Sequence, residues 1–247
     1  GNKHSTSSTL CQMSSEKVVP PSLKIPLDFS LKDQWLDRDK YYLNVSEQGT
    51  PEWHAVRNGL RLTASRFEEA HRYFEDPSFK FPVSTSVEAA QERMRIGSIK
   101  EAEIREWFKR SKYLPAGWSV MKVGIAVPKF DTRIGASVDG LILNEKGIPV
   151  AILEIKCPKR VYTELKGNLG GVRSLREKDP LRKHIKRDHY AQMHGGMATY
   201  DVQQAYYVVY GHEENKIHVE MIPFNREYWS RSLYPGICCY IYEKFLL

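Results

Sequence analysis

The most informative stretch of this chain reads Ile148-Pro149-Val150-Ala151-Ile152-Leu153-Glu154-Ile155-Lys156. Apolar side chains on both faces are typical of a strand buried inside a sheet. Glu154 and Lys156 are two residues apart, so they face the same side of that strand. A carboxylate in a buried strand is costly unless something compensates its charge, and a metal ion beside the lysine would do so. The alternative is a strand end in solvent, with a Glu-x-Lys pair on its outer face.

A second carboxylate, Asp139, lies fifteen residues upstream of Glu154 in the run 134–143. Asp139-Gly140 separates two apolar runs, and such a dipeptide usually forms a hairpin turn. We therefore expect one strand to start at this turn while Glu154 lies late in the adjacent strand, so that the two carboxylates meet. Carboxylate oxygens completed by water suit Mg²⁺. The ion could then activate a water molecule and stabilise charge on a phosphate.

The surrounding segments predict a mixture of strands and helices. We expect strands at 118–127, 134–143, 149–157, 202–210 and 216–222. We expect helices at 51–59, from 63 onward, at 86–110, at 185–200 and after Asn225. The predicted fold class is therefore α/β, a mixed central sheet flanked by helices, in a single domain over 51–247. Residues 1–50 are predicted to be a flexible N-terminal arm and an irregular lead-in.

The net charge of +7 comes from one part of the chain. The segment 156–188 carries eleven lysines and arginines against four acidic residues, an excess equal to the net charge of the whole chain. A concentrated basic segment is the electrostatic footprint of a polyanion such as nucleic acid. The alternative is a lysine-rich loop that faces solvent.

Several protein classes are excluded. No apolar run approaches the roughly 20 residues needed to span a bilayer, so no membrane partner is expected. The four cysteines, at 11, 157, 238 and 239, lack metal-ligand spacing and fit a reducing compartment. We expect a soluble intracellular protein, nuclear if it comes from a eukaryote or its virus and cytoplasmic if it comes from a phage or bacterium.

Five motifs, in the right order over residues 53–194, resemble those of lambda-type exonucleases, the YqaJ-like viral recombinases of the PD-(D/E)xK nuclease superfamily. The motifs are Trp53-His54-x-x-Arg57 with Leu62-Thr63-Ala64-Ser65, Arg95-x-Gly97-x-x-x-Glu101, Gly135-Ala136-Ser137-Val138-Asp139-Gly140, Glu154-Ile155-Lys156-Cys157-Pro158 and Tyr190-Ala191-Gln192-Met193-His194. Val138 stands where the family has proline, and His194 where it has glutamine. The resemblance covers roughly residues 50–225, extends to viral alkaline exonucleases, and implies a restriction-endonuclease-like core.

The resemblance also implies roles for individual residues. Asp139, Glu154 and the backbone carbonyl of Ile155 become metal ligands, and Lys156, Glu101 and Gln192 join the two carboxylates as catalytic residues. Arg57, Ser65 and Ser137 match the residues that hold a 5′-phosphate. Without the motifs, Glu101 and Arg57 would be ordinary surface residues. Asp131 is the nearby candidate ligand for a second metal, although its spacing differs from that of the family.

The function implied is a metal-dependent 5′→3′ exonuclease that degrades one strand of double-stranded DNA. It would need Mg²⁺, with Mn²⁺ able to substitute, and DNA with free ends. It would leave 3′ overhangs for a single-strand annealing protein, and the resemblance implies a ring-shaped trimer. DNA contacts are expected from the basic segment, at Lys159, Arg160, Arg182, Lys183, Lys186 and Arg187. The alternatives are a related endonuclease, an alkaline nuclease that also cuts RNA, or a non-catalytic DNA-binding module.

Overall fold

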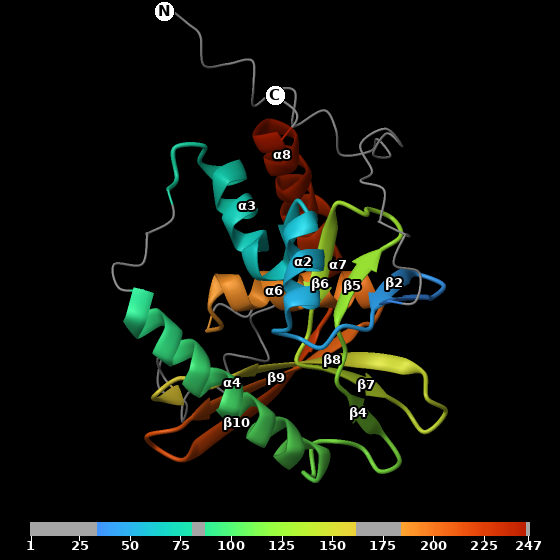
Figure 1. The fold of residues 1–247 in the computed structure, drawn as a ribbon, viewed down its shortest axis with the longest axis vertical. Coiled ribbons are helices and arrows are strands. Elements are labelled where there is room, and N and C mark those ends of the chain that lie inside the picture. The colour runs from blue at the N-terminus through green and yellow to red at the C-terminus, as the bar shows by residue number, and fades with distance from the viewer. Residues whose placement is uncertain (1–33, 81–86, 162–183, 246–247) are drawn as a thin grey trace, which may run out of the picture.

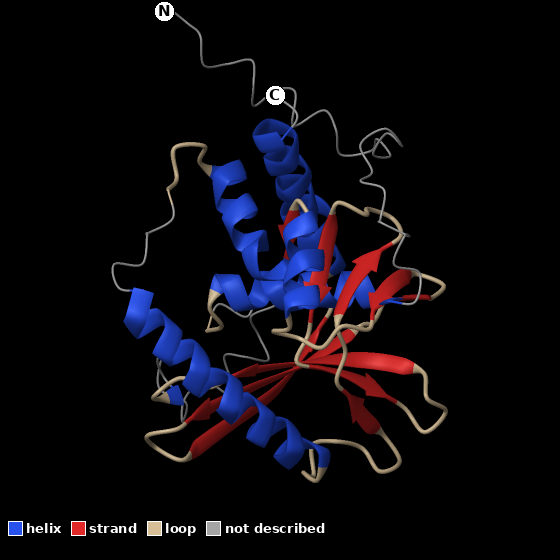
Figure 2. Cartoon of the chain, in the orientation of Figure 1, coloured by secondary structure: helices blue, strands red, loops and turns tan. Residues whose placement is uncertain are grey.

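The computed structural model describes residues 34–80, 87–161 and 184–245 of the 247, without the side chains of 87–94. Two five-stranded sheets lie at an angle to each other, with helices around them (Figures 1 and 2). Each sheet has one parallel strand pair and is otherwise antiparallel. The prediction of a mixed α/β fold is therefore confirmed.

The first sheet has the strand order β1 (Trp35–Asp37), β2 (Tyr41–Asn44), β5 (Ile125–Pro128), β6 (Ile134–Ser137), β3 (Leu62–Thr63). The second has the order β10 (Lys216–Pro223), β9 (Gln204–Gly211), β8 (Pro149–Lys156), β7 (Gly140–Leu143), β4 (Ser119–Met121). The helical segments are α2 (Pro51–Gly59), a 3₁₀ turn (Ala64–Arg66), α3 (Phe67–Glu75), α4 (Val87–Lys109), α6 (Arg187–Tyr200), α7 (Arg226–Tyr228), a π-helical turn (Trp229–Leu233) and α8 (Tyr234–Phe245). None of these described helices is both long and apolar enough to cross a membrane.

Alternation along β8 explains how its two faces are used. Ala151, Leu153 and Ile155 pack in one cluster with Ile104 and Phe108 of α4. The intervening Ile152 packs in another cluster with Met193 and Met197 of α6. Glu154 and Lys156 follow Ile152 at intervals of two, so the strand places them toward α6. The sequence prediction that these two side chains share a face follows directly from this local geometry.

The prediction of a hairpin turn at Asp139-Gly140 was wrong. Val138 and Asp139 instead connect β6 of the first sheet to β7 of the second, so the run predicted as one strand is divided between two sheets. The reversal before β8 lies at Asn144, whose carbonyl accepts the N–H of Gly147, a glycine with φ of 73°. Gly140 serves close packing rather than a turn, because a Cβ there would lie 2.6 Å from a methyl group of Val120.

The predicted irregular lead-in was wrong over residues 35–44. β1 and β2 form there, and β2 pairs antiparallel with β5, joining this segment to the first sheet. Strands of three and four residues carry too little periodicity to be recognised without their partner. The predicted strand at 118–127 is also divided, into β4 and β5 of different sheets. Residues 1–33, which include the predicted arm, lie outside the described residues.

Candidate active site

Asp139 and Glu154 meet where β7 and β8 pair. The backbone N–H of Asp139 donates to the carbonyl of Leu153 at 3.1 Å. Its carboxylate Oδ2 accepts the backbone N–H of Ile155 at 2.6 Å. Glu154 lies between these two residues with 1% of its surface exposed. The strand pairing expected from the sequence therefore brings the carboxylates together, although no turn is involved.

Burial dominates the electrostatics of these carboxylates. It raises the pKa of Asp139 to about 7, aided by the negative charge of Glu101. It also raises the pKa of Glu154 to about 7, against the lowering effect of Lys156. Two buried carboxylates whose ionisation is this costly form a site that a cation would stabilise.

Lys156 links the strand to helix α6. Its Nζ lies 2.7 Å from Oε1 of Glu154 and donates to Oε1 of Gln192 at 3.1 Å. Burial by itself lowers the pKa of Lys156, but the charges of Glu154 and Asp139 outweigh it and raise the pKa. The lysine is therefore an ammonium at neutral pH. A charged lysine is suited to orienting a water molecule or contacting a phosphate.

Glu101 approaches the same site from α4. Its carboxyl group shares a side-chain hydrogen bond with that of Asp139, and its negative charge raises the pKa of Asp139. Burial raises the pKa of Glu101, and Arg105 opposes that rise. Five predicted residues thus converge from α4, the β6–β7 connection, β8 and α6: Glu101, Asp139, Glu154, Lys156 and Gln192.

The sequence reasoning missed Arg105, which is 7% exposed and lies beside these residues. Its Nη2 donates to Oε1 of Glu101 at 2.8 Å, and its Nε donates to the backbone carbonyl of Asp139 at 2.6 Å. The sequence did contain a signal for this contact: Arg105 follows Glu101 by four residues, and residues four apart on a helix lie on one face.

The predicted 5′-phosphate residues form a linked cluster. Nη2 of Arg57 donates to Oγ of Ser65 at 2.9 Å. Nε1 of Trp53 donates to Oγ of Ser137 at 3.1 Å, and the Arg57 guanidinium lies 5.2 Å from the centroid of the Trp53 ring. Burial and the nearby charge of Arg66 lower the pKa of Arg57. Within 34–80, 87–161 and 184–245, no carboxylate pairs with Arg57, so a bound anion would relieve an uncompensated charge.

The donor set fits a divalent cation held by few protein ligands. Among the described residues, no group of three or more His, Cys, Asp or Glu side chains is arranged to hold a metal. The buried pair Asp139 and Glu154 does match the one or two carboxylates that usually hold Mg²⁺, with water completing its shell.

Asp131, the candidate for a second metal, lies apart from this cluster. It precedes β6, whereas Asp139 follows it. Both of its carboxylate oxygens bond to Arg133, at 2.8 and 2.7 Å, and one also accepts from Tyr234. A fully buried carboxylate so occupied is a structural ion pair, and the structure does not bring it to the predicted metal site.

The predicted DNA-contacting residues have different surroundings. Lys159 and Arg160 lie 3.4 and 3.9 Å from the carboxylate of Glu213, on the β9–β10 turn. Arg187 lies 2.8 Å from Glu68 and 2.7 Å from Glu75 of α3, so its charge is already paired. Lys186 precedes α6 and is half-buried. Arg182 and Lys183 lie outside the described residues.

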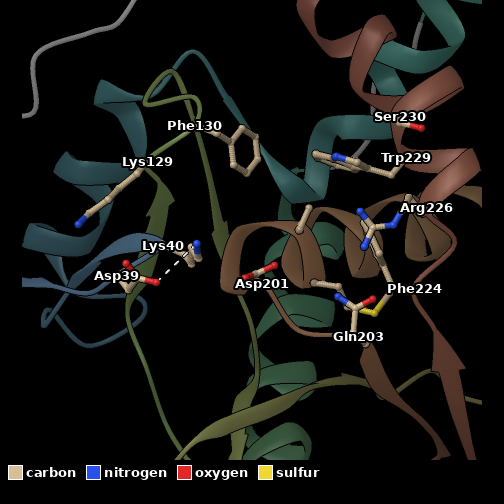
Figure 3. Close-up of a pocket in the computed structure, with 12 residues that line it drawn as sticks. Asp39, Lys40, Lys129, Phe130, Asp201, Gln203, Phe224, Arg226, Trp229 and Ser230 are labelled. Carbon is tan, nitrogen blue, oxygen red and sulfur yellow. Dashed lines mark ion pairs between the residues drawn. The ribbon is translucent and has the colours of Figure 1, made fainter. Parts of the chain in front are cut away.

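A separate pocket lies at the C-terminal end of α6, away from Gln192 (Figure 3). It has a volume of about 470 Å³ and includes Asp201, Phe130 and Trp229 in its lining. Among the predicted site residues that the structure describes, none lines it. Its oppositely charged Asp39 and Lys40 pair with each other at 3.5 Å.

Comparison with known proteins gives one family and one fold. Residues 52–203 match the family model of the YqaJ-like viral recombinase domain. An alkaline exonuclease, LHK-Exo from Laribacter hongkongensis, is similar in structure, with 20% identity over 78% of this chain and 92% of that one, at a TM-score of 0.48. The structure of LHK-Exo in complex with dAMP has the same identity and coverage and a TM-score of 0.50, which shows a shared fold. None of the curated proteins compared with the chain matches it.

Proposed function

The chain belongs to the family of YqaJ-like viral recombinase domains, and from this we propose that it is a metal-dependent 5′→3′ exonuclease acting on double-stranded DNA. One observation carries the proposal: two buried carboxylates, a charged lysine and a glutamine converge on one site within the family's matched residues. Hydrolysis of one strand would leave a 3′ overhang for recombination by strand annealing.

The chain's own residues have distinct roles in this proposal. Lys156, held between Glu154 and Gln192, contacts the scissile phosphate or orients the attacking water with its ammonium. Asp139 and Glu154 would hold Mg²⁺, or Mn²⁺ in its place, together with the backbone carbonyl of Ile155. The ion would supply positive charge and an activated water, as metals do in phosphoryl chemistry.

The position of the arginine cluster supports cleavage from an end rather than within a strand. Ser137 belongs to the Arg57 cluster, and Asp139 belongs to the carboxylate cluster two residues later. Two residues of extended chain span about 7 Å, so the clusters adjoin. A guanidinium binds phosphate oxygens in a fork. A terminal 5′-phosphate on Arg57 would thereby place the neighbouring phosphodiester bond near Asp139.

The proposal includes partners. The substrate is duplex DNA with free ends, and the basic segment binds its phosphates. A single-strand annealing protein would receive the 3′ overhang, and copies of the chain would assemble into a ring-shaped trimer. Gel filtration with light scattering measures the assembly directly, and a monomer at working concentration would contradict the trimer.

An end-labelled duplex tests the activity. With Mg²⁺, we expect mononucleotides to be released from the 5′ end, and we expect EDTA to stop the release. A duplex whose ends are closed by hairpins is the control, because an exonuclease cannot start on it. Cleavage of the closed duplex would favour the endonuclease alternative, and cleavage of an RNA duplex the alkaline-nuclease alternative. Binding of the duplex without any cleavage would favour the third alternative, a non-catalytic DNA-binding module.

A further inference from the structure

We propose that Arg105 is a positioning residue that fixes the orientation of Glu101 and Asp139 for metal binding, beyond neutralising their charge. The inference rests on the proposed metal-dependent nuclease function. It concerns a residue outside the predicted ligands, lysine and phosphate-binding groups.

The Arg105 guanidinium connects two elements of the fold. Arg105 uses two different nitrogens for two different elements: Nη2 for Glu101 on its own helix, at 2.8 Å, and Nε for the carbonyl of Asp139, at 2.6 Å. The planar fork of arginine fixes the directions of both hydrogen bonds at once. Helix α4 is therefore tied to the connection between β6 and β7 through one buried side chain.

Asp139 lies in the connection between two strands. Its position is not set by a regular ladder, because the strand pairing of β6 ends at Ser137 and that of β7 begins at Gly140. Individual hydrogen bonds hold it instead, including one between its carboxyl group and that of Glu101. Its N–H donates to Leu153, its Oδ2 accepts from the N–H of Ile155, and its carbonyl accepts from Arg105. The bond from Arg105 joins this residue to the helix that carries Glu101.

The charge of Arg105 and the orientation it imposes have opposite effects on metal binding. Glu101, Asp139 and Glu154 are three carboxylates, and Lys156 and Arg105 are two cations that contact them. Removing one positive charge from this group strengthens its Coulomb attraction for a divalent cation. A purely electrostatic Arg105 would thus weaken metal binding. If orientation dominates, loss of the fork lowers metal affinity even when the charge is kept.

Arg105→Lys keeps the charge and removes the fork, and Arg105→Met removes both. We expect each variant to bind Mn²⁺ about 10- to 100-fold more weakly than the wild type, the loss typical for residues that orient metal ligands. Calorimetry with Mn²⁺ alone, on the DNA-free protein, measures this without any cleavage. The Mg²⁺ concentration for half-maximal cleavage should rise by a similar factor, and duplex affinity in EDTA should not change.

Arg72→Lys is the matched control. Arg72 also bonds a glutamate four residues earlier on its helix, Glu68, at 2.8 Å. It lies on α3, and it contacts none of the five residues of the carboxylate site in the described structure. We expect this variant to bind Mn²⁺ like the wild type. A thermal melt of every variant establishes that it is folded. If Arg105→Lys does not fold, the Mn²⁺ affinity of Arg105→Met tests the proposal.

The outcomes are distinct. Wild-type Mn²⁺ affinity in Arg105→Lys overturns the positioning role, as does tighter binding in Arg105→Met. If the wild type cleaves DNA and only these affinities are unchanged, the positioning proposal fails while the nuclease proposal stands. If the wild type neither binds Mn²⁺ nor cleaves the duplex, the nuclease proposal fails and this inference fails with it.

Discussion

Glu154 is 1% exposed, and its pKa is raised to about 7 by burial. Asp139 has a pKa raised to the same region, with Glu101 adding to the effect of burial. Ionisation of either carboxyl group near neutral pH therefore opposes folding. Such groups are typical of functional sites, where chemistry rather than stability determines the residue.

Glu154→Gln keeps the shape of the side chain and removes its charge. We expect cleavage to fall below detection at saturating Mg²⁺, because the cation loses one of two carboxylates. Duplex affinity should stay within a few-fold of the wild type, since phosphate contacts elsewhere supply most of it. Gel shift in EDTA and nucleotide release in Mg²⁺ measure the two effects, and full activity would remove Glu154 from the site.

Asp139→Asn should stabilise the metal-free protein at pH 8. The pKa of Asp139 is higher in the folded protein, about 7, than the ordinary 3.8, so the folded state binds more protons between these values. The stability from its protonated form is complete below about pH 4 and is lost as the pH rises through 7. The neutral amide avoids this loss, worth up to about 4 kcal/mol at pH 8.

Urea unfolding in EDTA at pH 5 and pH 8 measures the difference. The gain from Asp139→Asn should be large at pH 8 and much smaller at pH 5. An equal gain at both would mean that ionisation of Asp139 does not oppose folding.

Arg57→Ala should remove a preference for phosphorylated ends. Arg57 bonds Ser65, packs on Trp53, and lies in a cluster with Ser137. We expect the wild type to degrade a 5′-phosphorylated duplex faster than a 5′-hydroxyl duplex, and the variant to degrade both at the slower rate. Initial rates on the two substrates measure this. Equal rates in the wild type would mean that this cluster is not a phosphate site.

At the scale of elements, helix α6 determines how the site is assembled. It carries Gln192 in its N-terminal half and packs on α3 as well as on β5, β6 and β8. Two glycines allow this close approach. A Cβ at Gly195 would lie 2.5 Å from the ring of Phe67, and a Cβ at Gly196 would lie 2.7 Å from Ile152. The helix predicted at 185–200 forms because packing outweighs the low helix propensity of glycine.

Gly195→Ala should therefore destabilise the protein by about 1–3 kcal/mol through overpacking. Gly97→Ala in α4 is the control, because no atom of the described residues lies within 4 Å of a Cβ there. That variant should be neutral or more stable by up to about 1 kcal/mol. Urea unfolding of both variants measures the contrast, and similar values for the two would contradict the close approach of α6 to Phe67.

At the scale of the whole molecule, the basic segment connects β8 to α6, so both of its ends are next to the candidate active site. Its described residues are partly paired: Arg187 with Glu68 and Glu75 of α3, and Lys159 with Glu213. The excess charge seen in the sequence is therefore not all available for DNA. Arg187 also helps to hold the start of α6 against α3.

Replacing Arg182, Lys183 and Lys186 with glutamine should reduce the salt dependence of duplex binding. The slope of log affinity against log salt should fall by roughly 0.9 for each phosphate that the variant no longer binds. Arg187→Gln alone should change the slope little and lower the stability to urea, because Glu68 is buried and loses a partner. An unchanged slope in the triple variant would mean that the segment faces solvent.

The sequence by itself determined the features that depend on neighbours along the chain. Strand β8, the shared face of Glu154 and Lys156, and helix α6 with Gln192 follow from local periodicity, and five motifs indicated the family. The tertiary structure alone decided that Asp139 lies between two sheets rather than at a turn, and that 35–44 pairs with β5. It also decided that Arg187 faces α3 and that Arg105 bonds the carbonyl of Asp139. Strand pairing and buried ion pairs join residues far apart in the sequence, so no local pattern encodes their partners.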